Sequence, residues 1–232
     1  MDIRLLLIEM KMTKPKLSEI ANTYSLILCD IWGVVHNGNN IFPDAINTLL
    51  AYLDAGGDIC LITNAPRRSE IIRDYLFNMG VERNICNNIV SSGDCSYSWL
   101  SSIGDRPLFH IGPEKDNSLF AGLDLKKVSE FDCLECICTG FFNEYIESIG
   151  DYQKILETLL ERGIVIHCAN PDLYVNKGSI RLPCAGLIAQ SYSQMGGEIV
   201  YFGKPHPYIY DLALEKVLQS NQKSVSKYSI LS

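Results

Sequence analysis

The sequence predicts an α/β fold built on a parallel sheet with helices on both of its faces. Short apolar runs that resemble strands, such as "YSLILCDI" and "DICLIT", alternate with longer stretches of helical periodicity. Parallel neighbours cannot be joined by a tight turn, so strands that alternate with helices are typical of parallel sheets. Glycines follow the helical stretches and supply their stops. We therefore expect a doubly wound parallel sheet.

The first helix is expected between these two strands. Ala45, Leu49 and Leu53 recur at the spacing of one helix face, and Gly56 and Gly57 follow as a stop.

The second helix is expected after "TNAPRRS", and it leads to the apolar run "NIVSS". Ser69 is a candidate N-cap, because its hydroxyl can accept a hydrogen bond from a free backbone amide. Gly80 marks the end of the helix.

A second alternating block covers residues 96–195. The pattern is compatible with a continuation of one sheet and with a separate α/β module inserted into the first, and it leaves both open. After this block, "EIVYFGKPHPYIYDLALEKVL" predicts a short strand, a Gly-Lys-Pro turn and a helix. The final "KYSILS" resembles the opening of one more strand, and the loop that would follow it is not present in the sequence.

Composition is that of an ordinary globular protein. Of the 232 residues, 47% are apolar and 20% are charged, and the net charge of −7 is spread along the chain. The sequence has no cluster of basic residues of the kind that binds nucleic acid. The opening "MDIRLLLIEM" has only about five consecutive apolar residues, too few for a signal sequence or a membrane span. We therefore expect a cytoplasmic protein with no nucleic-acid or membrane partner.

Nine cysteines are present, most of them inside apolar runs, as expected of buried small hydrophobic residues in a reducing compartment. Cys133, Cys136 and Cys138 have a spacing compatible with a metal site. However, their segment has the pattern of a buried strand, and no second pair of ligands follows. We expect these thiols to be part of the core.

Polar residues occur where three expected strands end. Asp30 follows "LILC", Thr63 and Asn64 follow "ICLI", and Lys204 follows "VYFG". Strand ends of this kind lie along one edge of a doubly wound sheet, where ligands bind. A carboxylate, a hydroxyl and an ammonium together suit a phosphoryl group. Each residue alone also has a simpler interpretation, as a turn cap, a turn hydroxyl or a solvated lysine.

Five short motifs occur in an order that resembles the haloacid dehalogenase-type hydrolases, specifically their class IIA, NagD-like phosphatases: "LILCDIWGVVHNG", "LITNAPRRS", "CANPD", "CAGLIAQ" and "FGKPHP". The resemblance covers nearly the whole chain. It implies a Rossmann-like core formed by residues 1–93 and 196–232, with an α/β cap domain formed by residues 94–195.

The resemblance also implies roles for the residues at the strand ends. Asp30 would be the nucleophile that forms an aspartyl-phosphate intermediate. Thr63 and the backbone amide of Asn64 would bind the phosphoryl group, and Lys204 would neutralise its charge.

The same resemblance implies a cofactor and a substrate site. Mg²⁺ would be bound by the Asp30 carboxylate and by the backbone carbonyl of Trp32, which a change of side chain leaves in place. Asn170 and Asp172, in the cap, would lie close to the leaving group.

Two departures from the family pattern are visible. Trp32 stands where a second aspartate would protonate the leaving oxygen, and such acid catalysis is worth about 10²–10⁴ in rate. His36 is near enough in sequence to replace it, but we expect an exposed loop histidine. The fourth motif, a Gly-Asp pair with a further aspartate that would complete the Mg²⁺ site, is not in the sequence, so the core is expected to be incomplete at its C-terminal end.

The leading hypothesis is therefore a Mg²⁺-dependent phosphatase of small phosphorylated metabolites, such as nucleotide or sugar phosphates. The alternative is a catalytically impaired binding protein that keeps the fold. Cleavage of a carbon–halogen or carbon–phosphorus bond is a third option, which Trp32 favours and the class IIA layout opposes. By analogy with other caps of this kind, a homodimer is possible.

Overall fold

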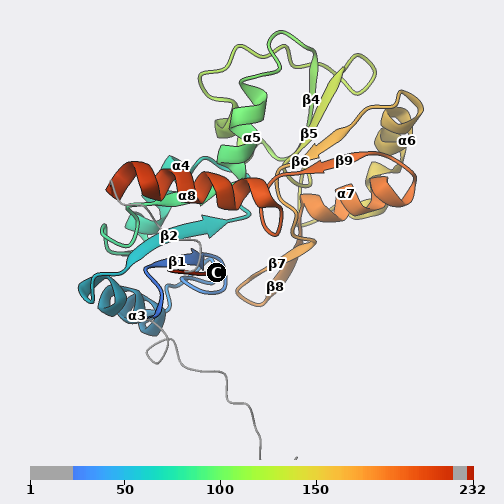
Figure 1. The fold of residues 1–232 in the computed structure, drawn as a ribbon. Helices are drawn as coiled ribbons and strands as arrows, with labels where there is room; N and C mark the ends of the chain where they lie inside the picture. The colour runs from blue at the N-terminus through green and yellow to red at the C-terminus, as the bar shows by residue number, and fades with distance from the viewer. Residues whose placement is uncertain (1–22, 222–228) are drawn as a thin grey trace, which may run out of the picture.

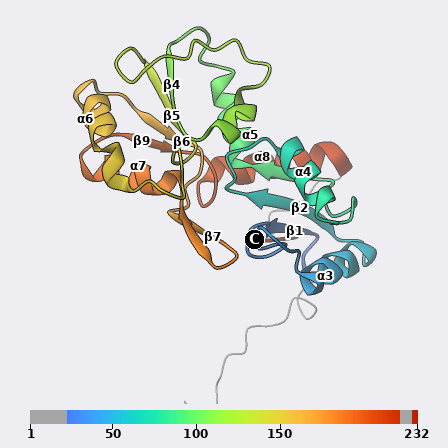
Figure 2. The same ribbon diagram turned by 180° about the vertical axis from the view of Figure 1, so that it is seen from behind.

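The computed structural model describes residues 23–221 and 229–232, so the expectation for the N-terminal "MDIRLLLIEM" lies outside the described residues. Two four-stranded sheets and a two-stranded hairpin make up the β-structure of this part (Figure 1). Figure 2, from behind, shows the same division into two lobes joined through the region of α5. No helix in the described ranges is long and apolar enough to cross a membrane.

The first sheet has the strand order β10-β1-β2-β3, and every neighbouring pair is parallel. Its strands are β1 (Leu26–Asp30), β2 (Asp58–Thr63), β3 (Ile89–Ser91) and β10 (Ile230–Leu231). The strand expected at "KYSILS" is therefore present and pairs with β1. In the register, Asp30 lies beside Ile62 and Thr63 lies beside Ser91, so two of the three predicted polar strand ends share one edge of this sheet. The third, which precedes Lys204, belongs to the second sheet.

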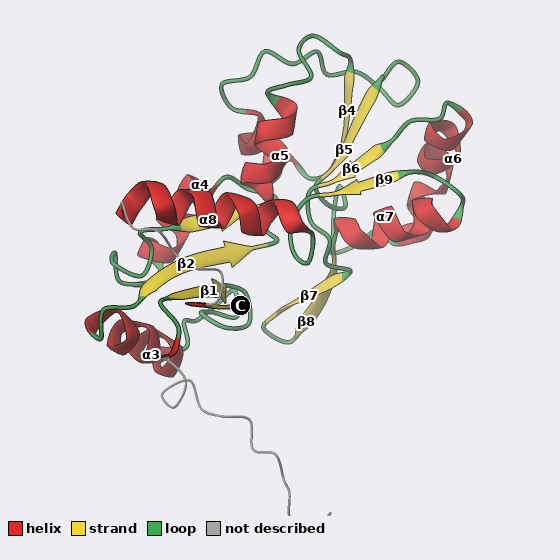
Figure 3. Ribbon diagram, viewed as in Figure 1, coloured by secondary structure: helices red, strands yellow, loops and turns green. Residues whose placement is uncertain are grey.

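Helices cover both faces of the first sheet, as Figure 3 shows, so the expected doubly wound arrangement is confirmed. Successive side chains of a strand point to opposite faces. Ile27 and Cys29 pack toward α3 (Pro43–Asp54) and α4 (Ser69–Asn78). Leu26 and Leu28 point to the other face and form its core with the apolar side of α8 (Pro207–Asn221).

The start of α4 differs by one residue from the sequence prediction. Arg68 is the N-cap, and Ser69 is the first residue of the helix. The amide of Ser69 donates instead to Oδ1 of Asp94, which also closes a capping box at the start of α5 (Ser92–Leu100). One carboxylate thus caps two helices, which a local sequence pattern does not reveal.

The second sheet is separate from the first, which resolves the alternative that the sequence pattern left open. Its order is β4-β5-β6-β9, all parallel. The strands are β4 (Leu108–Ile111), β5 (Glu135–Cys138), β6 (Ile166–Cys168) and β9 (Ile199–Tyr201). β9 begins four residues after position 195, so this sheet extends past the expected end of the cap.

One face of the second sheet packs on α6 (Gln153–Glu161) and α7 (Ala185–Gln194). The other face meets η2 (Glu114–Phe120), a 3₁₀ helix, and the end of α5, while a second 3₁₀ helix, η3 (Ile149–Tyr152), precedes α6. Because Cys95 of α5 packs in the first core and Leu100 packs in the second, α5 connects the two sheets.

An antiparallel hairpin, β7 (Tyr174–Lys177) and β8 (Ile180–Pro183), extends from the second sheet toward the end of β1 (Figure 1). The amide of Gly178 at its tip donates to the carbonyl oxygen of Asn37, 3.4 Å away. The hairpin therefore contacts the loop that follows β1.

All nine cysteines are buried and have free thiols. Cys136 and Cys138 lie in β5, and burial raises the pKa of both thiols well above the ordinary range. Burial also raises the pKa of Cys29 to about 11. Thiols in such surroundings remain protonated near neutral pH and act as small apolar side chains.

Candidate functional site

The carboxyl ends of β1 and β2 meet the turn that follows β9, and this places Lys204 against Asp30. Lys204 Nζ lies 2.5 Å from Asp30 Oδ1 and 3.3 Å from the carbonyl oxygen of Ile62. Asp30 Oδ1 also accepts a hydrogen bond from the amide of Ile31 at 2.8 Å. Both bonds end on Oδ1, which leaves the second carboxylate oxygen of this partly exposed side chain available to a ligand.

Asn64 holds the Lys204 turn in place through both ends of its amide side chain. Its Oδ1 accepts from the Lys204 amide at 2.7 Å, and its Nδ2 donates to the Lys204 carbonyl at 3.2 Å. The same Nδ2 donates to Asp172 Oδ1 at 2.9 Å, which links the first sheet to a loop of the second. Gly203, with φ +105°, precedes the turn, and a Cβ there would lie 2.7 Å from Asn64 Oδ1.

Thr63 is buried at the end of β2. Its Oγ1 accepts a hydrogen bond from the amide of Ala65 at 3.2 Å, so the hydroxyl proton is free to be donated. Asp30, Thr63, Asn64 and Lys204, predicted from separate motifs, thus lie along one edge of the structure.

Trp32 contacts the hairpin of the second sheet. Its indole Nε1 donates to the carbonyl oxygen of Asn176 in β7 at 2.9 Å. Its ring lies edge-on to that of His36, with centroids 5.0 Å apart. The indole therefore serves as a contact between the two parts of the chain, a role that position 32 did not suggest in the sequence.

His36 is buried, with 2% exposure, so the expectation of an exposed loop histidine is wrong. Its Nδ1 accepts a hydrogen bond from the amide of Gly38 at 2.9 Å, and its ring also packs edge-on against Tyr75. Burial lowers the pKa of this imidazole, which makes it neutral near pH 7. The local bond to Gly38 and the two aromatic neighbours explain its position.

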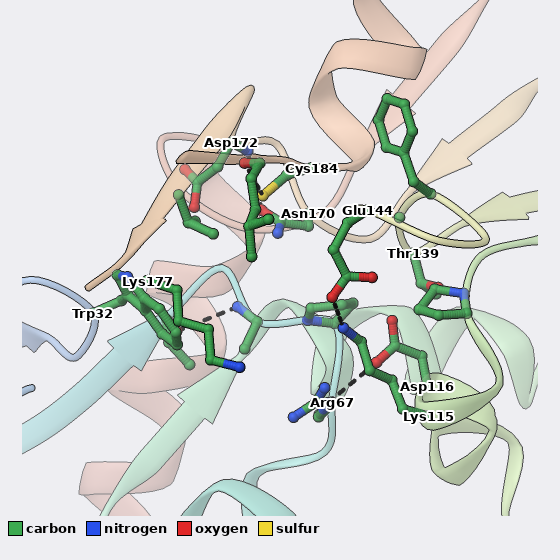
Figure 4. A pocket seen from close by; sticks show the side chains of 18 of the residues that line it. Trp32, Arg67, Lys115, Asp116, Thr139, Glu144, Asn170, Asp172, Lys177 and Cys184 are labelled. Carbon is green, nitrogen blue, oxygen red and sulfur yellow. Dashed lines mark hydrogen bonds and ion pairs between the residues drawn. The ribbon is translucent and has the colours of Figure 1, made fainter. Parts of the chain in front are cut away.

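A cavity of about 370 Å³ opens between the two sheets (Figure 4). Four of the predicted site residues line it: Trp32, Thr63, Asn170 and Asp172. Asn170 is buried, and its Oδ1 accepts from the Asp172 amide at 3.0 Å. Asp30, Asn64 and Lys204 do not line the cavity, and Asn64 joins them to it through its bond to Asp172.

Sequence reasoning missed two ion pairs on the wall of this cavity. Arg67 Nε lies 3.1 Å from Asp116 Oδ1, and Lys115 pairs with Glu144. Asp116 is 3% exposed; burial raises the pKa of its carboxyl, and the charge of Arg67 opposes that shift. Arg67 stands within the "TNAPRRS" motif, but its partner Asp116 lies 49 residues away in η2, where no local pattern indicates the pairing.

Two oxygens of the site match the ligand type that Mg²⁺ prefers. In the turn after β1, three backbone amides donate to the carbonyl oxygen of Ile31, and the amide of Gly33 donates to the carbonyl oxygen of His36. The carbonyl oxygen of Trp32 accepts none of these bonds. Residues 23–221 and 229–232 contain no group of three or more acidic, histidine or cysteine side chains that could hold a metal ion. One carboxylate and one carbonyl fit an ion that takes its other ligands from water and phosphate.

The chain is similar to known hydrolases. Residues 27–126 match the family model described as haloacid dehalogenase-like hydrolase. A crystal structure of a hydrolase of the haloacid dehalogenase-like family from Brucella suis 1330 is 37% identical, with a TM-score of 0.89, and the match covers 94% of this chain and 83% of that one. A comparison with curated proteins gave no match.

Two more distant structures share the fold. A possible sugar phosphatase of the same superfamily from Cytophaga hutchinsonii is 20% identical, with a TM-score of 0.78, and the match covers 93% of this chain and 79% of that one. A glycerol phosphate phosphatase from Mycobacterium tuberculosis, solved in complex with calcium, is 19% identical with a TM-score of 0.64; the match covers 85% of this chain and 58% of that one.

Proposed function

This chain belongs to the haloacid dehalogenase-like hydrolases, and from that membership we propose that it is a Mg²⁺-dependent phosphatase of small phosphorylated metabolites, such as sugar or nucleotide phosphates. The observation that carries the proposal is the 2.5 Å contact between Lys204 Nζ and Asp30 Oδ1 at the edge where Thr63 also ends its strand. A carboxylate held beside an ammonium and a hydroxyl is the arrangement that a phosphoryl group requires.

The proposed reaction has two steps. In the first, the free oxygen of Asp30 attacks phosphorus, and the bond between phosphorus and the leaving oxygen breaks. Lys204 and Thr63 hold the phosphoryl oxygens and offset the charge that builds on them. In the second, water attacks phosphorus and loses a proton, which balances the proton that the departed oxygen takes up from the solvent. The bond between phosphorus and the Asp30 oxygen breaks, and phosphate and the free carboxylate are released.

Mg²⁺ would be held by the Asp30 carboxylate and the Trp32 carbonyl, and it would neutralise charge on the phosphoryl oxygens. Two protein oxygens give a weak site by themselves, because the affinity of a hard cation grows with the number and charge of its ligands. We expect the ion to bind together with the phosphate group rather than before it.

Leaving groups that depart as strongly basic alkoxides, as from sugar and nucleotide phosphates, are expected to be turned over slowly. The Trp32 side chain has no proton to give to a departing oxygen, and its N–H is donated to Asn176. His36 is buried and neutral. Without an acid, substrates whose leaving oxygen is stable as an anion lose the least rate.

For the domain organisation, we propose the expected core of residues 1–93 and 196–232 and cap of residues 94–195, with the second boundary moved to the end of β9, because β9 pairs with β6 of the second sheet. In that arrangement, Asn170 and Asp172 meet the part of the substrate that leaves. The nine free, buried thiols support a reducing compartment such as the cytoplasm. A homodimer formed through the caps remains part of the proposal.

The test is phosphate release from p-nitrophenyl phosphate in the presence of Mg²⁺. We expect Asp30→Asn to abolish turnover, because an amide oxygen is a poor nucleophile. The control is Asp54→Asn, an exposed carboxylate at the end of α3, which we expect to behave as wild type. Equal turnover in the wild type and in Asp30→Asn would overturn the assignment of the nucleophile.

The second candidate is a binding protein that keeps the site without turnover. The use of the position-32 side chain as a contact to the hairpin favours it. Calorimetry with sugar and nucleotide phosphates, paired with the turnover assay, separates the two candidates. Binding without phosphate release would support the binding protein.

A further inference from the structure

We propose that the cavity contains a second anion-binding site, formed by Lys177 and Arg67, and that the physiological substrate carries a carboxylate or a second phosphate in the part that leaves. This inference rests on the proposed phosphatase function and names its substrate class. It is carried by the charges on the cavity wall and by the contacts that hold Lys177.

Three cations line the cavity, and two of them have carboxylate partners. Arg67 pairs with Asp116, and Lys115 pairs with Glu144. Lys177 has no carboxylate within ion-pair distance in the part of the chain that the structure describes. The cavity therefore contains one cation whose charge is not matched by a direct partner.

The remaining carboxylate and the imidazole of the cavity do not change this assignment. Asp172, on the loop before β7, accepts a bond from Nδ2 of Asn64. His36 is buried, and its lowered pKa leaves it uncharged. Lys177 Nζ instead donates to the hydroxyl of Tyr145, 3.2 Å away, a neutral partner that an anion can displace.

Arg67 supplies the second half of the site. Its Nε is bonded to Asp116, which is almost fully buried and so fixes the plane of the guanidinium. Within the described residues, the Arg67 side chain makes this one hydrogen bond, so the N–H groups of both terminal nitrogens are free. A guanidinium held in this way suits the two oxygens of a carboxylate or phosphate. In Figure 4, Arg67 and Lys177 extend toward the same part of the cavity.

Trp32 positions the lysine. Its N–H is bonded to the carbonyl of Asn176, the residue immediately before Lys177 in β7. The indole also packs on Gly38: a Cβ there would lie 2.7 Å from the ring and 3.2 Å from Cγ of Lys177. The backbone and the stem of Lys177 are therefore both held by the segment that follows Asp30.

The size of the cavity fits one small substrate. Thr63 lies on the same wall as Arg67 and Trp32, so a phosphoryl group at Thr63 and an anion at Arg67 share one space of about 370 Å³. Pockets of this volume hold small metabolites.

The experiment compares two phosphonates that cannot be hydrolysed, 4-(phosphonomethyl)benzoate and its methyl ester. They differ in one carboxylate, and their binding is measured by calorimetry in the presence of Mg²⁺. We expect the wild type to bind the carboxylate about tenfold more tightly, the size of one charge-assisted hydrogen bond. In Lys177→Met, which keeps the stem, this ratio should fall to about two or less. The control Lys154→Met, on the exposed side of α6, should keep the wild-type ratio.

Trp32→Phe tests the positioning role, because it keeps an aromatic ring and loses the N–H. The ratio should fall to between those of the wild type and Lys177→Met. A wild-type ratio near one, a ratio unchanged in Lys177→Met, or no binding of either compound would overturn the inference. If the ratio depends on Lys177 but no phosphate ester is hydrolysed, the proposed phosphatase function fails and the anion site stands.

Discussion

Acid is expected to destabilise the protein through His167, a buried histidine at the junction of the two sheets. Its ring is 8% exposed in β6 and stacks on Trp99 of α5, with centroids 3.8 Å apart. The His167 ring also lies 6.0 Å from that of Phe202, which follows β9, and Phe202 is at the same distance from Trp99. Its Nδ1 is buried without a hydrogen-bond partner in the described residues. A proton added there would therefore place a charge in an apolar stack.

The magnitude follows from the pKa. Burial lowers the pKa of His167 from 6.5 to about 4. Because the folded-state pKa is below the unfolded one, the contribution of this neutral ring to stability is complete above pH 6.5 and is lost as the pH falls toward 4. At about 1.4 kcal/mol per pKa unit, the loss between pH 7.5 and pH 4.5 is about 2.5 kcal/mol.

The perturbation is His167→Phe, which keeps the stacked ring and removes the titrating group. Urea unfolding at pH 7.5, 6.5, 5.5 and 4.5 gives the free energy of unfolding for each protein. The difference between the variant and the wild type should shift in favour of the variant by about 2.5 kcal/mol from the highest pH to the lowest. His206→Phe, at a partly exposed ring that stacks on Tyr201, is the control and should follow the wild type. Parallel curves for His167→Phe and the wild type would refute the reasoning.

Three further predictions concern the edge of the first sheet. Lys204→Met should lower kcat for p-nitrophenyl phosphate by about 10²–10³, because it removes charge stabilisation at the phosphoryl group, and a thermal melt that is unchanged would show that folding is intact. In a series of phosphate esters, kcat/KM of the wild type should fall steeply as the leaving group becomes more basic. Trp32→Asp should flatten that dependence, because it adds an acid at position 32. Equal slopes in the two proteins would contradict the missing acid at this position. Gly203→Ala should cost about 1–3 kcal/mol in the free energy of unfolding, since φ is +105° and the new Cβ would meet Asn64 Oδ1 at 2.7 Å; unchanged urea unfolding would contradict this.

The alternation of apolar strands and helices made the doubly wound sheet predictable, because a strand that is buried on both faces is a continuous apolar run in the sequence. Ile27 and Cys29 pack on one layer of helices, and Leu26 and Leu28 pack on the other. Every position of this part of β1 is therefore apolar. The same pattern left open whether the second block continued the sheet. Strand pairing across the chain decides that point, and the periodicity of one segment contains no information about its partner.

The part of the candidate site that lies at strand ends was predictable from the sequence. Asp30 and Thr63 end neighbouring strands of the first sheet, whose parallel topology brings them to one edge. Lys204 follows β9 of the second sheet and reaches this edge through the turn that Asn64 holds. His36 was misplaced because its burial depends on the rings of Trp32 and Tyr75, which are not its neighbours in a regular element.

The cavity wall was not predictable for a related reason. Arg67 and Asp116 are 49 residues apart, and each lies outside a regular strand or α-helix. Their contact exists only because α5 connects the two sheets and brings η2 beside the end of β2. A charged residue in a loop has no local feature that indicates its partner, so the proposed second anion site could not be predicted from the sequence.

Asn64 joins the edge that carries Asp30 and Lys204 to the cavity. An amide has both a donor and an acceptor, and Asn64 uses the acceptor on the Lys204 amide and the donor on the Lys204 carbonyl and Asp172. An aspartate would have acceptors alone and would face Asp172 with a like charge, while a serine would be too short to span both partners. The position of Lys204 beside Asp30 is therefore tied to the position of Asp172 on the cavity wall. Loss of the Asn64 amide would therefore release both the turn that carries Lys204 and the loop that carries Asp172.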